Sequence, residues 1–378
     1  MRREIKHAGI IGGIIVALVV GVGLYFVSLD QTAKVVQFTP LPKSNETSSQ
    51  NTVQNLPDES QYPLAPNLVG ITGYVNTTPE DLQAKLKDKV VLYDFWTYSC
   101  INCIRTFPYL KAWNEKYADK GLVIVGIHSP EFEFEKDINN VKMATAKYGI
   151  AYPVVLDSDH KTWDAFGNRY WPAEYITDYR GHIRHTHFGE GNYDETEKVI
   201  QQLLDERSQQ MGLQENMTQN LVNIPEHQFG FEMTPELYFG YSFAIGRSFI
   251  GNHEGFQPEQ AVTYTLPDTF QQDHFYLGGK WDNFADSVKL ESDNGKIVLP
   301  YYAKDVHIVA SGGNVTDIQI QVDGKPLTPD NAGMDAKNSQ AHIAENRLYN
   351  IVSDKSAGGH VLTITAHPGF EIFTFTFG

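Results

Sequence analysis

Cys100 and Cys103 are the only cysteines in this chain of 378 residues. They follow the apolar run VLYDFW, residues 91–96, and form the motif C-x-x-C. Two sulfurs held on one rigid turn at this spacing can form and break a disulfide bond with each other. The spacing therefore favours thiol–disulfide exchange, in which one thiolate attacks and the second sulfur resolves the mixed disulfide.

Two other uses of such a pair are less consistent with the sequence. A structural zinc site needs four ligands, and the chain has no second cysteine pair, so scattered histidines would have to complete it. A structural disulfide that closes so short a loop constrains the unfolded chain little. The run HIRHTH also places His185 and His187 on one face of a strand. These two imidazoles could bind a metal, but a solvated strand face explains them as well.

The elements around the cysteines explain how the pair is positioned. Residues 89–96 are predicted to form a buried strand, and an amphipathic helix is predicted to follow, with Ile104, Phe107 and Leu110 on one face. Cys100 would then lie where the strand ends and the helix begins. The free N–H groups and the positive end of the helix dipole favour the thiolate form there, whereas Cys103, one turn further on, is sheltered.

The rest of the chain after residue 63 divides into two parts. Strand and helix patterns alternate over residues 64–210, which predicts a central sheet with helices on both faces. Over residues 222–378 only strand patterns occur, about seven of them. These predict an all-β sandwich or jelly roll.

Residues 1–30 are predicted to be a membrane anchor. Basic residues precede an uncharged segment, residues 8–29, whose roughly 22 residues at about 1.5 Å each would cross a bilayer core. The positive-inside rule then places the remaining chain outside the cytoplasm, in a single-pass cell-membrane protein. A cleaved signal peptide is the alternative. Residues 31–63 are rich in Ser, Thr, Asn, Gln and Pro, which is typical of a polar linker.

The charge of the chain limits the partners that it can have. The formal net charge is −16 at pH 7. Nucleic acids need a basic surface to neutralise their phosphates, so no nucleic-acid partner is expected.

The segment VVLYDFWTYSCINCIRTFPYL, residues 90–110, resembles the active-site segment of the thioredoxin superfamily, and in particular its extracytoplasmic TlpA-like branch. The order of parts is similar to that of DipZ-type proteins, in which a β-sandwich domain follows the TlpA-like domain. The motifs TPELYFGY, GGKW and FTFTFG carry the resemblance into the second half. The resemblance implies a thioredoxin fold over residues 64–210 and a galactose-binding-like, carbohydrate-binding-like sandwich over residues 222–378.

The resemblance also assigns roles to individual residues. Cys100 would be the attacking thiol and Cys103 the resolving one, while Asp94 matches the buried acid that exchanges a proton with Cys103. Pro172 matches a proline that follows a cis peptide bond, and the backbone at Trp171 would pair with a substrate strand.

Trp96 matches a tryptophan that packs beside the active-site turn, and we group it with the substrate-binding residues in a structural rather than a chemical role. The chain departs from many TlpA-like reductases at Thr106, where those relatives carry a glutamate. Asp94 alone, or Glu131, would then supply the carboxylate that tunes the resolving thiol.

Two related functions within the superfamily fit less well. The thiol peroxidase motif would need a proline where Tyr93 stands. A thioredoxin-like copper chaperone would need three residues between its cysteines, and His128 would be the nearest histidine ligand.

The expected function is a membrane-anchored oxidoreductase that exchanges disulfides with exported thiol proteins, with reduction favoured over oxidation. It needs no cofactor beyond the Cys100–Cys103 redox disulfide. A separate membrane electron-transfer protein would supply electrons, because the single predicted span contains no cysteine. The alternatives are a disulfide-forming oxidase and a cell-wall glycan-binding protein that uses Trp281, Tyr301 and Tyr302.

Overall fold

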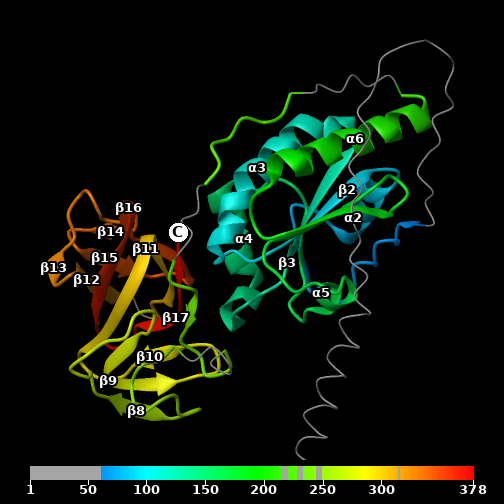
Figure 1. Ribbon diagram of the computed structural model, residues 1–378. Coiled ribbons are helices and arrows are strands. Elements are labelled where there is room, and N and C mark those ends of the chain that lie inside the picture. Colours follow the sequence, from blue (N-terminus) through cyan, green and yellow to red (C-terminus); the bar gives the residue numbers. More distant parts are fainter. Residues whose placement is uncertain (1–60, 214–219, 228–232, 244–248, 314–315) are drawn as a thin grey trace, which may run out of the picture. The chain divides into compact units, whose positions relative to one another are not determined.

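The computed structural model describes residues 61–378, apart from 214–219, 228–232, 244–248 and 314–315. The predicted membrane span, residues 8–29, and most of the predicted linker lie outside the described residues. Among the helices of the described part, none is long and apolar enough to span a membrane. Figure 1 shows an α/β fold followed by a domain built of strands.

The α/β fold is built on a six-stranded sheet in the order β1-β4-β3-β2-β5-β6. Its central strand β2 pairs in parallel with β3 and antiparallel with β5. The strands are β1 Gly73–Val75, β2 Val90–Trp96, β3 Leu122–His128, β4 Val154–Leu156, β5 Ala173–Thr177 and β6 Ile183–Phe188.

Helices cover both faces of this sheet, as the alternation of patterns predicts. They are α2 Pro79–Leu86, α3 Ile101–Tyr117, α4 Ile138–Tyr148, α5 Lys161–Ala165 and α6 Tyr193–Met211. A 3₁₀ turn, η3 Glu133–Lys136, precedes α4. Asp137 separates the two because its backbone is extended and its carboxylate accepts the Asn139 N–H at 2.8 Å, which caps α4.

Strand β2 sends alternate side chains to opposite faces of the sheet. Leu92 and Trp96 pack in the cluster that also contains residues of α3, α4 and α6, whereas Tyr93 and Phe95 pack in the cluster that contains residues of α2 and α5. Because the side-chain period of a strand is two, Asp94 lies on the same face as Leu92 and Trp96. The strand pattern thus places this acid under the helix that carries both cysteines.

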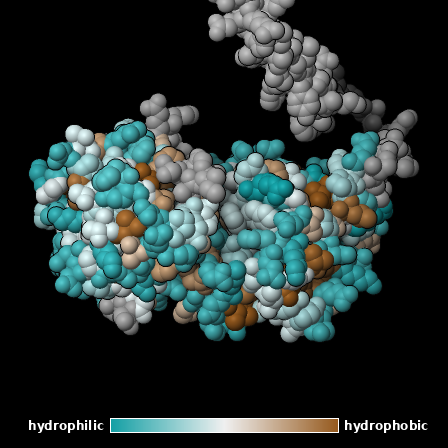
Figure 2. Space-filling model, turned by 90° about the horizontal axis from the view of Figure 1, so that it is seen from below, coloured by the Kyte–Doolittle hydropathy of each residue, from teal (hydrophilic) through white to brown (hydrophobic). Residues whose placement is uncertain are grey.

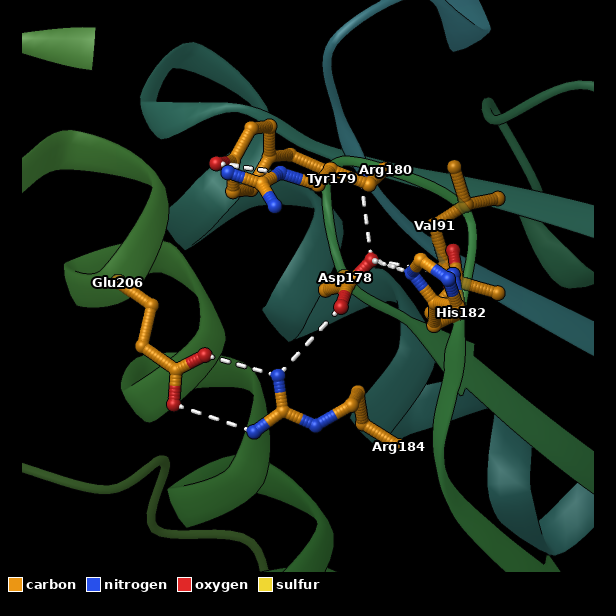
Figure 3. Close-up of polar contacts among 8 residues, drawn as sticks. Val91, Asp178, Tyr179, Arg180, His182, Arg184 and Glu206 are labelled. Atoms are coloured by element: carbon orange, nitrogen blue, oxygen red, sulfur yellow. Dashed lines mark hydrogen bonds and ion pairs between the residues drawn. The ribbon is translucent and has the colours of Figure 1, made fainter. Parts of the chain in front are cut away.

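A partly buried polar cluster fastens the hairpin of β5 and β6 to α6 (Figure 3). The Asp178 Oδ1 accepts the backbone N–H groups of Arg180 and His182, each at 3.0 Å. The Arg184 Nη1 contacts the Asp178 Oδ2 at 3.4 Å and the Glu206 Oε2 at 2.9 Å. One carboxylate therefore closes the turn and holds the guanidinium that reaches the last helix.

We expect Asp178→Ala to lower the free energy of unfolding by about 2–3 kcal/mol, because it leaves two turn N–H groups and part of a buried guanidinium without an acceptor. Urea unfolding measures this change. The matched control is Asp159→Ala, which removes an ion pair with Lys161 in which both side chains are more than half exposed. It should change stability by less than about 0.5 kcal/mol, and equal effects of the two variants would contradict the role given to Asp178.

The second domain is entirely β in the described residues, as predicted, but it has more strands than the pattern indicates. Eleven strands join in one hydrogen-bonded sheet, in which β11 and β16 are long and their pairing contains two register shifts. Three of the eleven strands, Leu237–Tyr238, Lys325–Pro326 and Ala336–Lys337, contain only two residues each, which is too short to show an alternating pattern in the sequence. The strands are β7 Leu237–Tyr238, β8 Ala261–Tyr264, β9 Tyr276–Asn283, β10 Val288–Leu290, β11 Gly295–Ser311, β12 Thr316–Val322, β13 Lys325–Pro326, β14 Ala336–Lys337, β15 Gln340–Ile343, β16 Arg347–Ala366 and β17 Glu371–Phe377.

Apolar residues of the α/β fold and of the β domain share one small buried cluster. Ile101, the first residue of α3, and Phe132 pack there with residues of β7, β11, β16 and β17. The rings of Phe132 and Phe373 are 5.2 Å apart between centroids. The first turn of the cysteine-bearing helix is therefore covered on one side by the second domain.

The described surface carries few large apolar groups. On the face shown in Figure 2, hydrophilic residues predominate and hydrophobic residues form small separate patches. This surface agrees with the strongly acidic composition of the chain.

Candidate active site

The two cysteines lie at the start of α3, where the sequence places them. Cys100 is the N-cap residue, and its Sγ accepts the Cys103 N–H at 3.4 Å. Both thiols are free, and Cys100 is partly exposed whereas Cys103 is fully buried. Solvent can therefore reach the sulfur of Cys100 but not that of Cys103, which is the arrangement that an attacking and a resolving thiol would need.

The environment of Cys103 favours its protonated form. Burial raises the pKa of the Cys103 thiol well above its usual value, and the hydrogen bond and charge of Cys100 raise it further. A negative charge on Asp94 adds to this effect. Cys103 therefore needs a nearby group that accepts its proton before it can attack as a thiolate.

Asp94 is the acid that lies within electrostatic range of Cys103. It is 1% exposed, and burial raises the pKa of its carboxyl to about 8. Neither carboxyl oxygen has a hydrogen-bond partner among the described residues. Such a carboxyl can take up or return a proton near neutral pH, which agrees with the role that the resemblance assigns to it.

The sequence places Trp96 among the substrate-binding residues, and the structure corrects this. Trp96 is fully buried, and its ring packs edge-on against Phe107 at 5.1 Å and against His128 at 4.9 Å. It supports the active-site turn from the core and offers no surface to a client. His128 is also buried, and its burial lowers the pKa of the imidazole to about 3, so this side chain stays neutral.

The predicted cis proline is confirmed, because the Trp171–Pro172 peptide bond is cis. Trp171 is partly exposed, and its Nε1 donates to the Ser129 carbonyl at 3.0 Å. Its ring lies 4.3 Å from that of Trp163. Substrate binding at Trp171 and Pro172 stays a prediction.

Sequence reasoning missed Glu135, which fixes the loop before Cys100. This fully buried carboxylate accepts the Ser99 hydroxyl at 2.5 Å and the backbone N–H groups of Glu131 and Phe132 at 2.6 and 3.0 Å. Burial raises the pKa of Glu135 in spite of these bonds. No local pattern distinguishes Glu135 from its acidic neighbours in the segment EFEFEK.

Glu131, the alternative considered from sequence, stays a predicted partner of the resolving thiol. Its Oε1 accepts the hydroxyl of Tyr238, on β7, at 2.7 Å.

A second carboxyl, Glu174, is the one that the structure brings next to Asp94, since the two residues are direct partners across β2 and β5. Glu174 was also missed, because its neighbour is 80 residues away in the chain.

Two of the three aromatics considered for a glycan surface are core residues. Trp281 and Tyr301 are fully buried, whereas Tyr302 is 42% exposed, so the prediction of a glycan-binding surface made of all three is wrong.

His185 and His187 are both partly buried. In the part of the chain that the structure describes, no group of three or more His, Cys, Asp or Glu residues is arranged to hold a metal ion.

The fold and the site together define a class of protein, the thioredoxin-like redox domains. Such a domain has an α/β sheet, a partly exposed N-cap cysteine, a second cysteine that is buried, a buried acid and a cis proline. Comparisons with known proteins agree. Residues 62–204 match the Redoxin family, and residues 234–378 match the thioredoxin-like C-terminal domain family. The thiol-disulfide oxidoreductase YkuV of Bacillus subtilis is 34% identical over 143 residues, which are 37% of this chain and 94% of YkuV. The chain therefore belongs to the thioredoxin-like thiol-disulfide oxidoreductases, a family of redox enzymes.

The similarity to DipZ extends over both domains. Protein DipZ of Mycobacterium tuberculosis is 36% identical over 318 residues, which are 83% of this chain and 43% of DipZ. The chain thus spans less than half the length of the DipZ proteins that it matches. A solution structure of a thioredoxin-like protein in the oxidized form is 33% identical, covers 38% of this chain and 97% of its own chain, and has a TM-score of 0.35.

Proposed function

We propose that the protein works outside the cytoplasm, anchored by residues 8–29, and exchanges disulfides with exported proteins through Cys100 and Cys103. The observation that carries this proposal is the unequal exposure of the two thiols, with Cys100 partly exposed at the N-cap of α3 and Cys103 buried behind it. The basic residues before the apolar segment support the orientation.

We propose reduction as the main direction, with electrons supplied by a separate membrane protein. The catalytic cycle would begin with the dithiol form, in which the Cys100 thiolate attacks a client disulfide. Formation of disulfides is the second candidate direction. No residue between the two sulfurs decides between them, because Ile101 and Asn102 carry no charge that would favour one redox state.

The proposed location can be tested with a membrane-impermeant maleimide applied to intact cells after an impermeant phosphine reductant. The full chain should be labelled at Cys100, and Cys100→Ser should lose the label because Cys103 is buried. Labelling of Cys100 that appears only after lysis would overturn the extracytoplasmic proposal. Incubation of the reduced and oxidised enzyme with a disulfide-bonded and a dithiol peptide then compares the two directions.

A further inference from the structure

The face of the sheet below α3 contains two acids in register. Asp94 on β2 and Glu174 on β5 are direct partners in an antiparallel pair, which puts their Cβ atoms about 4.5–5.5 Å apart on the same face. On the other side of Asp94, β3 contributes Gly126, which has no side chain to neutralise a charge. The acid therefore has a second carboxyl as its neighbour in the sheet.

Both carboxyl groups are isolated from solvent. Asp94 is 1% exposed and Glu174 is 2% exposed. Both oxygens of Asp94 and the Oε2 of Glu174 are buried without a hydrogen-bond partner among the described residues. Two buried acids at this separation cannot both ionise without a large cost, because nothing in the described surroundings offsets the second charge.

The pair adjoins the buried thiol. Tyr152 lies within electrostatic range of all three groups. Burial is the largest cause that raises the pKa of its hydroxyl, and charges on Asp94, Glu174 and Cys103 raise this pKa further. The other titratable groups that face the pair are Tyr193 from α6, within electrostatic range of Glu174, and His187 from β6, opposite Glu174 in the sheet. Asp94, Glu174 and His187 are successive partners across β2, β5 and β6. His187 is partly exposed, so this row of side chains leads towards the surface.

We propose that Glu174 is a positioning residue for the thiol chemistry: together with Asp94 it forms a carboxyl pair that holds and releases the proton of Cys103. This inference rests on the exchange reaction proposed above. Burial raises the pKa of each carboxyl to about 8, and the charge of Asp94 contributes to the shift of Glu174. Because the two titrations are coupled, the pair releases its first proton at a lower pH than its second. The singly ionised pair can then accept the proton of Cys103.

The step that uses the pair is the resolution of the mixed disulfide. The Cys103 proton passes to the singly ionised pair, and the Cys103 thiolate attacks the Cys100 sulfur. The Cys100–Cys103 bond forms as the bond between Cys100 and the client sulfur breaks. The client sulfur leaves as a thiolate with the electron pair of that bond and takes a proton from solvent. The enzyme dithiol is thereby oxidised by two electrons and the client disulfide is reduced.

The experiment is a carbon-13 NMR titration of the side-chain carboxyls in the full reduced chain. Glu174→Gln should move the titration midpoint of Asp94 to lower pH by about one unit, because a neutral neighbour replaces a carboxylate. The pH profile of disulfide exchange should move in the same direction. An unchanged Asp94 midpoint would overturn the proposal.

Three further variants make the result specific. By reciprocity, Asp94→Asn should lower the midpoint of Glu174, so the coupling can be measured even if Glu174→Gln does not fold. Glu174→Asp keeps the charge and should leave the Asp94 midpoint closer to its wild-type value than Glu174→Gln does. Glu190→Gln is the control, because this partly buried carboxylate pairs with Arg105 and should leave Asp94 unchanged. The midpoints need no exchange activity, so loss of the exchange reaction and loss of the carboxyl coupling are separate outcomes.

Discussion

Replacement of Cys100 by serine should reduce disulfide-exchange turnover by a factor of about 10³ or more. The hydroxyl is not ionised near neutral pH and cannot form a mixed disulfide, and the remaining thiol, Cys103, is fully buried. The measurement is the rate at which the enzyme reduces a model protein disulfide with dithiothreitol as electron donor. Circular dichroism of the variant checks that it folds.

Cys103→Ser is the matched variant and should fail at the other step. Cys100 keeps its exposure and its place at the N-cap, so the first attack still occurs, but no sulfur resolves the product. A stable mixed disulfide with the client should therefore accumulate and appear as a larger, reductant-sensitive species. Equal trapping by Cys100→Ser, or turnover of Cys100→Ser at the wild-type rate, would contradict the roles given to the two cysteines.

The dependence of stability on pH should change markedly in Asp94→Asn. Burial raises the pKa of Asp94 to about 8, so the folded reduced protein keeps a proton that the unfolded chain releases above about pH 4. Wild-type stability should therefore fall as the pH rises from about 4 to about 8. The Asn variant loses this contribution, and its decrease in free energy of unfolding between pH 5 and pH 8 should be smaller by about 2–4 kcal/mol.

Urea unfolding of the reduced protein at several pH values measures this slope. The slope is the informative quantity, because a buried amide without a partner also shifts stability by an amount that does not depend on pH. Asp159→Asn changes an exposed carboxylate and should leave the wild-type slope intact. Parallel curves for Asp94→Asn and the wild type would show that Asp94 is not held protonated in the folded state.

The central part of the site could be predicted from sequence because its signals are local. The C-x-x-C spacing follows directly after a buried strand, and Asp94 lies within that strand. Pro172 could be assigned through the motif around it, and the bond before it is cis. These residues can be assigned without knowing which distant segments of the chain pair.

The parts that could not be predicted depend on distant pairing and on burial. Glu174 gains its meaning from the register of β5 against β2, which places it opposite Asp94. Glu135 holds the Ser99 hydroxyl from a separate turn. Trp281 has sequence surroundings that fit a surface as well as a core, and its side chain is fully buried. Composition and periodicity do not determine such contacts.

The proposed function depends most on the Cys100–Cys103 pair acting as one redox couple. Equilibration of the full chain in dithiothreitol buffers of graded potential, followed by alkylation and mass analysis, tests this directly. Both thiols should disappear together in a single two-electron transition, with the loss of two hydrogens and no change in oligomeric state. Persistence of both thiols in oxidising buffer, or oxidation of Cys100 while Cys103 stays reduced, would contradict it.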